Sequence, residues 1–200
     1  EKQMDKIRDS DRRVGVIYTG CTWVSDNGVV IKRQLPDLNG WVYEHLLSTN
    51  RIVSSASGVL ARRRCFAEVG LFDEGLPGCP DWDMWIRLSR RYKFDFVSER
   101  LVRYSCRQNP GERKTDRVIN GREAIHDKLV DELSSRRAIH GAFHFQTGNF
   151  CRHNRRMSEG RRHLATAVLL SPFKIKYAFH LAASLLGHKA YASLAEAKRN

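Results

Sequence analysis

The chain has 200 residues, 42% of them hydrophobic, which is enough for one sizeable core or for one core with a helical appendage. Lys and Arg number 35 against 22 Asp and Glu, and the formal charge of +13 favours a polyanionic partner such as nucleic acid, an anionic membrane surface or a phosphorylated substrate. The five cysteines are scattered and form no CxxC pair, which argues against a zinc finger or a disulfide framework. No apolar run reaches the ~20 residues of a membrane span. We therefore expect a cytoplasmic protein.

The first hundred residues alternate between helical and strand patterns. The predicted helices are residues 1–10, 41–48, 63–70 and 81–91. The predicted strands are residues 14–20, 28–34, 52–63, 93–98 and 100–105. The last helix is the most clearly amphipathic, and Asp83 and Arg87 are predicted to pair on it because they lie four residues apart. This order of elements indicates an α/β domain.

The remaining chain is predicted to be helical. A polar segment at 109–119 indicates a linker between the α/β domain at 1–108 and a basic helical region at 120–200. Breaks between its helices are expected near Gly141, residues 157–158, residues 171–172 and Gly187. The residues typical of a tetratricopeptide-like hairpin are Gly148, Leu164, Ala167 and Pro172.

Three stretches in the α/β part carry a resemblance to a known family. The sequences "VGVIYTG", "SSASGVLARRRCFAEVGLFDE" and "PDWDMWIRLSRRYKFDFVSERLVRY" follow one another as in the second half of family 2 glycosyltransferases, and the opening "EKQ" resembles the helix after their Asp-x-Asp stretch. The resemblance implies a partial nucleotide-diphospho-sugar transferase (GT-A) fold. It also implies inverting transfer of a sugar from a nucleotide-sugar donor to a glycan or lipid-linked acceptor, in polysaccharide biosynthesis at the cell envelope.

Asp81, at the start of the Trp-bearing helix, matches the position of the catalytic base in that family. Inverting transfer needs a group that takes the proton from the acceptor hydroxyl as it attacks the anomeric carbon, and a carboxylate beside the sugar can do this. Pro80 stands where relatives usually carry a second acid. The alternative interpretation of Asp81 is an N-cap or first-turn carboxylate stabilised by the helix dipole. The neighbouring motifs make us favour the catalytic interpretation.

The resemblance assigns three further groups of residues to the site. The expected acceptor contacts are Trp82, Asp73 and Glu74. The expected donor-pocket residues are Ser55, Ser57 and Gly58. The expected residues at the rim are Arg103 and Tyr104. The alternatives are a core tryptophan and a solvated turn for the first group, and a tightly packed strand for the second.

The nucleotide-binding half of such enzymes has no counterpart in this chain. It contains neither the first nucleotide-binding strand nor, ahead of "EKQ", the Asp-x-Asp that holds Mg²⁺ or Mn²⁺ against the diphosphate. We therefore expect the metal ligands in an upstream segment and expect the isolated chain to be inactive. The chain also begins at Glu1 with a helical pattern that lacks an N-cap, which predicts that it is a piece of a longer protein.

The helical tail is strongly basic, with seven Lys or Arg against Glu159 alone between residues 152 and 176. This pattern is equally typical of a helix face at the inner surface of an anionic membrane and of a solvated helical bundle. The alternative to an enzyme is thus a non-catalytic module whose tail contacts a membrane, nucleic acid or protein, although no nucleic-acid-binding motif is present. His140 and His144 lie four apart, but no acidic or Cys partner follows at ligand spacing, so we assign no metal site.

Overall fold

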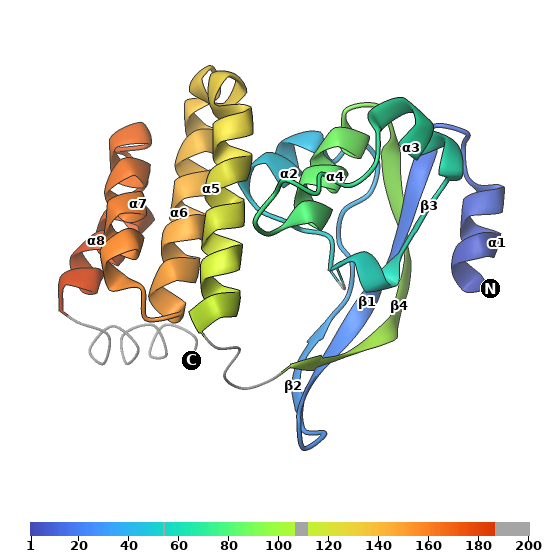
Figure 1. The fold of residues 1–200 in the computed structure, drawn as a ribbon, viewed down its shortest axis with the longest axis horizontal. Helices are drawn as coiled ribbons and strands as arrows, with labels where there is room; N and C mark the ends of the chain where they lie inside the picture. The colour runs from blue at the N-terminus through green and yellow to red at the C-terminus, as the bar shows by residue number, and fades with distance from the viewer. Residues whose placement is uncertain (54, 107–111, 187–200) are drawn as a thin grey trace. The chain divides into compact units, whose positions relative to one another are not determined.

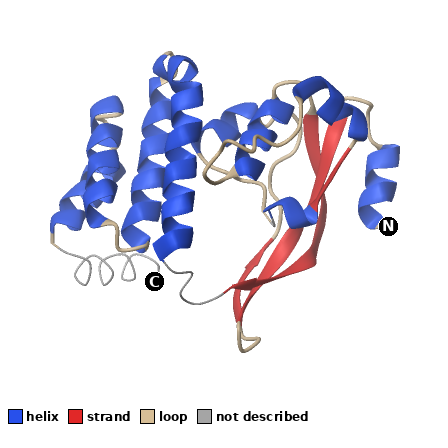
Figure 2. Ribbon diagram, viewed as in Figure 1, coloured by secondary structure: helices blue, strands red, loops and turns tan. Residues whose placement is uncertain are grey.

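The computed structural model describes residues 1–53, 55–106 and 112–186 (Figure 1). These residues divide into two compact units. The first unit comprises Glu1–Leu46 and Asn50–Gly121, and the second comprises Leu47–Thr49 and Arg122–Asn200. All the strands belong to the first unit, whereas the second is helical within the described part (Figure 2). The mixed α/β class predicted for the first half of the chain is confirmed.

The sheet of the first unit is built around one central strand, β1. The four strands are β1 (Val14–Ser25), β2 (Val30–Gln34), β3 (Val59–Ala61) and β4 (Lys93–Cys106). Strand β1 pairs antiparallel with β2 and β3 and parallel with β4, so the sheet is mixed. Residues 14–21 of β1 are all buried, as expected for a strand that is paired on both edges and covered on both faces.

The structure confirms the hairpin of β1 and β2 but changes two other strand predictions. The segment predicted as a strand at 52–63 forms a 3-10 turn, η1 (Ser55–Gly58), before the three-residue strand β3. The two strands predicted at 93–98 and 100–105 form one strand, β4, whose register against β1 shifts between Val97 and Arg100. Residues 98–99 form a bulge in β4, so the strand continues past them. The turn predicted from the residues at 98–100 is therefore wrong.

Four helices surround this sheet. They are α1 (Lys2–Asp9), α2 (Tyr43–Ser48), α3 (Arg63–Val69) and α4 (Pro80–Ser89). Each corresponds to a predicted helix. The apolar face of α4 is buried, with Trp82, Met84 and Leu88 fully covered. Helix α3 ends at Gly70, whose φ of +81° favours glycine and whose N–H donates to Phe66 O.

The helical part consists of α5 (Glu112–Ser134), α6 (Arg137–His153), α7 (Met157–Leu170) and α8 (Ile175–Leu185). Helix α5 already begins at Glu112, so residues 112–119 of the expected linker are helical. The break predicted near Gly141 is wrong because α6 runs through that residue. Glycine is needed there for packing, since a Cβ at this position would stand 2.6 Å from Ser171 Oγ. The break at 171–172 is confirmed, and the one at Gly187 lies outside the described residues.

Helices α6 and α7 pack against each other, and their glycines allow a close backbone approach. A Cβ added to Gly148 would stand 3.0 Å from Gly160 O, and one added to Gly160 would stand 3.1 Å from Gly148 O. Phe145, Leu164, Ala167 and Tyr177 form a core cluster between α6, α7 and α8. None of the described helices combines the length and apolar character that crossing a bilayer requires.

Gly15 provides a test of the packing around β1. A Cβ at Gly15 would stand 2.8 Å from both Cys65 Sγ and Tyr92 Cβ, which are buried side chains. We expect Gly15→Ala to lower the free energy of unfolding by about 1–3 kcal/mol because it overpacks the core. Urea denaturation measures this loss. In the control Gly75→Ala, the new Cβ would meet Asp73 Oδ1 at 3.2 Å, and the change should stay below about 0.5 kcal/mol.

Candidate functional site

The candidate site is centred on Asp81, in the first turn of α4. Asp81 is partly exposed and accepts a hydrogen bond from Asn50 Nδ2 at 3.3 Å. The Asn50 amide is itself held, because its Oδ1 accepts the Ile52 N–H at 3.1 Å. Sequence reasoning missed Asn50, and no spacing signal could have found it, since 31 residues separate it from Asp81.

Asp81 is not the N-cap of α4, which was one half of the alternative interpretation; it lies in the first turn of the helix, as the other half expected. Cys79 occupies the cap position, in a left-handed conformation with φ of +57°. The N–H groups of Trp82 and Asp83 donate to the Cys79 carbonyl at 3.0 and 3.3 Å. The Asp81 carboxylate is therefore not the capping group, although it still lies where the helix dipole favours a negative charge.

The turn that precedes Asp81 is held tightly by the first turns of α5. A Cβ at Gly78 would stand 2.0 Å from Arg117 O, and one at Gly121 would stand 2.4 Å from Gly78 C, so both positions require glycine. Arg117 Nε donates to Pro77 O at 3.3 Å, and Cys79 Sγ lies 3.7 Å from Val118 O. The left-handed Cys79 is a strained position for a residue with a side chain, and these contacts maintain it.

Arg87 holds the loop between α3 and α4 in place. Its Nε donates to Asp83 Oδ2 at 2.8 Å, which confirms the predicted pair on α4. Its Nη1 donates to Val69 O at 2.6 Å and its Nη2 to Leu71 O at 2.8 Å. The guanidinium thereby joins the buried Asp83 carboxylate to the two backbone carbonyls that flank Gly70.

The structure gives Trp82 a core position instead of an acceptor contact. Its side chain is fully buried, and its indole N–H donates to Leu46 O at 2.8 Å. Burial with a satisfied N–H leaves no ring face for a sugar in this structure. Trp85 is also buried, and it lies edge-on to the partly exposed Phe72, with the ring centroids 6.4 Å apart. Of these three aromatic residues, Phe72 is therefore the one available at the surface of this loop.

The acidic loop residues Asp73 and Glu74 lie between α3 and α4, in the loop that leads to Asp81. Asp73 Oδ1 accepts the Gly75 N–H at 2.8 Å, which forms a local Asx turn. Glu74 is exposed. Both lie on the segment that Arg87 ties to α4, so their backbone is positioned with the start of that helix.

The small residues expected to form the donor pocket lie in η1. Ser57 is exposed and Gly58 is buried, while the side chain of Ser55 lies outside the described residues. Gln3 joins this turn to α1 and β1: its Nε2 donates to Gly58 O at 3.0 Å and to Ile17 O at 3.2 Å. The first turn of α1 is thereby held beside Gly58.

Arg103 and Tyr104, the expected rim residues, pair with Thr22 and Trp23, in the part of β1 that also pairs with β2. Arg103 pairs in register with Thr22, whereas Val59, next to η1, pairs with Tyr18. The two pairs are four positions apart on β1, which corresponds to about 13 Å along the strand. The structure does not bring the expected rim and the expected donor pocket together.

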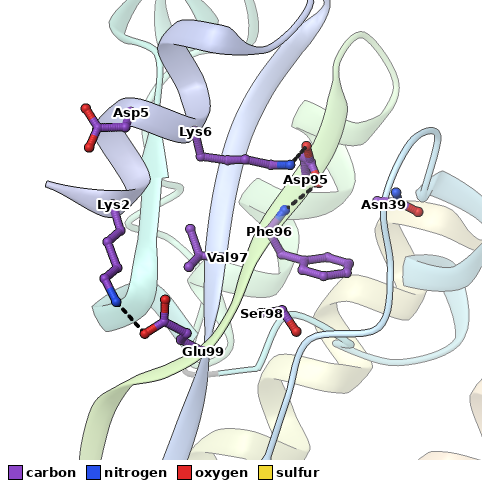
Figure 3. A pocket seen from close by; sticks show the side chains of 9 residues that line it. All are labelled: Lys2, Asp5, Lys6, Asn39, Asp95, Phe96, Val97, Ser98 and Glu99. Atoms are coloured by element: carbon purple, nitrogen blue, oxygen red, sulfur yellow. Dashed lines mark hydrogen bonds and ion pairs between the residues drawn. The ribbon is translucent and has the colours of Figure 1, made fainter.

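An open depression lies between α1 and β4 (Figure 3). Two ion pairs bridge it, Lys2 Nζ to Glu99 Oε2 at 2.5 Å and Lys6 Nζ to Asp95 Oδ2 at 2.9 Å. Three of these four side chains are at least 43% exposed, so the pairs attach α1 to β4 with little net stabilisation. None of the expected site residues lines this depression.

The residues around Asp81 do not fit the Mg²⁺ or Mn²⁺ that the resemblance implies. Asp81 and Asp83 are two residues apart on a helix, so their side chains point to different sides, and Asp83 is already paired with Arg87. Within the described part of the chain, the group of three side chains close enough to hold an ion is made of histidines and lies in the helical unit.

Comparison with known proteins supports a glycosyltransferase relationship over part of the chain. No protein-family model matches it. Two curated relatives match over 142 residues, 70% of this chain: an uncharacterized glycosyltransferase of Rickettsia conorii, 23% identical, and an uncharacterized glycosyltransferase of Rickettsia felis, 22% identical. The chain spans about a quarter (24%) of the length of each relative.

Arg87→Lys tests whether the guanidinium holds the loop in front of α4. A lysine keeps the charge but cannot reach Asp83 and both carbonyls together, so we expect the free energy of unfolding to fall by about 2 kcal/mol. Urea denaturation of the chain measures this loss. Arg91→Lys is the matched control, because the Arg91–Glu68 pair is exposed and 3.9 Å long; its effect should be below about 0.5 kcal/mol.

Proposed function

We propose that this chain is the acceptor-side part of an inverting glycosyltransferase of the GT-A type, with Asp81 as the general base. The observation that carries the proposal is the position of Asp81, a partly exposed carboxylate oriented by Asn50 at the start of a helix whose preceding turn is held rigidly. The two glycosyltransferase relatives support the general activity.

In the proposed reaction the acceptor hydroxyl loses its proton to the Asp81 carboxylate. The hydroxyl oxygen bonds to the anomeric carbon of the donor sugar from the face opposite the diphosphate. The bond between that carbon and the phosphate oxygen breaks, and its electron pair leaves with the nucleoside diphosphate. General-base catalysis of this kind contributes about 10²–10⁴-fold, and it requires a carboxylate held at hydrogen-bonding distance from the hydroxyl.

Other parts of the first unit have supporting roles in this proposal. Asp73, Glu74 and Phe72 offer acceptor contacts from the loop that Arg87 holds. Ser57 and Gly58 border the donor sugar. The Mg²⁺ or Mn²⁺ that neutralises the departing diphosphate would be bound by ligands outside this chain, so the isolated chain should be inactive.

Asp81→Asn tests the role of the base in the full-length protein to which this chain belongs. Release of nucleoside diphosphate from sugar nucleotides, with Mn²⁺ present, should fall by about 10²–10⁴-fold because the amide cannot take the proton. Donor binding, followed by equilibrium titration, should be retained, since Asn keeps the shape of the side chain.

Asp11→Asn is the control for this experiment, because Asp11 is an exposed carboxylate between α1 and β1 that pairs with Arg13. Its turnover should equal that of the wild type. Unchanged turnover in Asp81→Asn would remove Asp81 from the chemistry. A wild type that turns over no donor would favour a non-catalytic module.

A second candidate function, peripheral contact with an anionic membrane, rests on one surface of the helical unit. Phe173 is 97% exposed, Ile175 82% and Leu169 73%, and Lys174 and Lys176 lie between and beside them. Exposed large apolar side chains next to lysines are typical of an interfacial segment. This contact would bring a lipid-linked acceptor close to the enzyme at the inner face of the cell membrane.

Phe173→Ser tests this surface by cosedimentation with phosphatidylglycerol vesicles. Loss of one buried phenyl ring should weaken partitioning by about tenfold. Leu71→Ser, at a residue that is 76% exposed in the first unit, is the matched control and should bind like the wild type. Equal binding by both variants, or equal binding to neutral phosphatidylcholine vesicles, would contradict membrane contact through this segment.

A further inference from the structure

Four histidines from three helices form a contiguous cluster in the helical unit. His126 comes from α5, His140 and His144 come from α6, and His163 comes from α7. His126 Nε2 lies 2.9 Å from His140 Nε2, and His144 Nε2 lies 3.2 Å from the same atom. On the other side of its ring, His144 Nδ1 lies 2.9 Å from His163 Nδ1.

Hydrogen bonding alone satisfies this arrangement poorly. A ring nitrogen offers one in-plane position, which holds either a proton or a lone pair. His140 Nε2 therefore forms one good hydrogen bond, yet two other Nε2 atoms lie within 3.2 Å of it. Either both neighbouring rings donate to its one lone pair or both accept from its one N–H, so the two contacts share a single in-plane position and each is weaker than a full hydrogen bond. A cation between the three nitrogens would give each lone pair a ligand position of its own.

We propose that His126, His140 and His144 bind a divalent transition-metal ion, with Zn²⁺ as the preferred ion, through their three Nε2 atoms. One ligand atom from each of the three residues lies within 4.8 Å of those of the other two. Ligands about 2.0–2.1 Å from a tetrahedral Zn²⁺ stand about 3.3 Å apart, so small side-chain movements complete the site. Histidines four apart on one helix, here His140 and His144, face the same side.

The remaining protons fit this assignment. When Nε2 of His144 binds the ion, its proton lies on Nδ1, which donates to His163 Nδ1. His163 then carries its proton on Nε2, which is buried and lies 3.6 Å from Glu123 Oε1. His126 Nδ1 likewise lies 3.4 Å from Asp127 Oδ1. Carboxylates behind metal-bound histidines orient such rings and increase their basicity.

Neighbouring charges act on the cluster, and one of its rings reaches solvent. Burial lowers the pKa of His144 to about 3 and that of His163 to about 4. Arg122 and Arg162 oppose a nearby cation, but Arg162 is paired with Glu123. The His126 side chain is 20% exposed and connects the cluster to solvent.

Three nitrogen ligands leave the fourth position of a tetrahedral ion for water or an added ligand. The ion would join α5 to α6 and, through His144 and His163, orient α7. Imidazole ligands suit Zn²⁺, Cu²⁺ and Ni²⁺ better than Mg²⁺, so this site would be distinct from the diphosphate-binding metal of the proposed reaction.

Titration of the whole chain with Zn²⁺ against a chromophoric chelator tests the site. We expect one equivalent to bind and the melting temperature to rise with Zn²⁺ concentration. Co²⁺ in its place should show the visible ligand-field bands of a tetrahedral nitrogen site. His126→Gln, at the partly exposed ligand, should weaken binding at least tenfold without unfolding the chain. His163→Gln should weaken it about 10–100-fold by losing the orientation of His144.

His153→Gln is the matched control, because His153 is an exposed histidine on α6 outside the cluster. It should bind Zn²⁺ like the wild type. Binding that is unchanged in His126→Gln, or lost equally in His153→Gln, would overturn the proposal, as would a wild type that binds no Zn²⁺. Because the readouts are binding and melting, they are independent of glycosyl transfer.

Discussion

Hydrogen bonding along both edges of β1 is the constraint on which the α/β unit depends. Strand β4 runs parallel along one edge, while β2 and β3 share the other in succession. Side chains project from the faces of a sheet, and there Gly15 lies against the side chains of Cys65 and Tyr92. Strand β4 begins at Lys93, four residues after the end of α4 at Ser89. The pairing of β4 with β1 therefore fixes the position of the C-terminal end of α4, the helix that carries Asp81.

Two kinds of contact position the start of α4: a close backbone approach at two glycines and the charged hydrogen bonds of one arginine. Gly78 and Gly121 allow two backbones to approach at a distance that any side chain would prevent, and Arg87 joins the preceding loop to the buried Asp83. Both devices act on the backbone that precedes Asp81, whereas Asn50 is held through its own Oδ1, which accepts the Ile52 N–H. A base held in this way needs little reorganisation when an acceptor binds.

Several of the basic residues in the helical unit form contacts within that unit, although their sequence pattern suggested an exposed basic surface. Arg152 is buried and donates to Asn149, Arg156 pairs with Glu159, and Arg161 donates to Ser184 O. Much of the basic pattern therefore stabilises helix contacts inside the unit. Exposed basic side chains remain at Arg137, Arg155, Arg162, Lys174 and Lys176, and the last two adjoin the exposed Phe173 and Ile175, which is why the proposed membrane contact is placed there.

By itself the sequence determined the mixed α/β class, the β1–β2 hairpin, the pair of Asp83 with Arg87 and the position of Asp81 near the start of α4, because each depends on neighbours within a few residues. The tertiary structure decided what local patterns cannot: the bulge that makes β4 one strand, the burial of Trp82, the contact of Asn50 with Asp81, and the meeting of His126 with His140 and His144. These features arise where segments far apart in the chain pack closely, and the spacing of residues along the sequence does not show which distant segments come into contact.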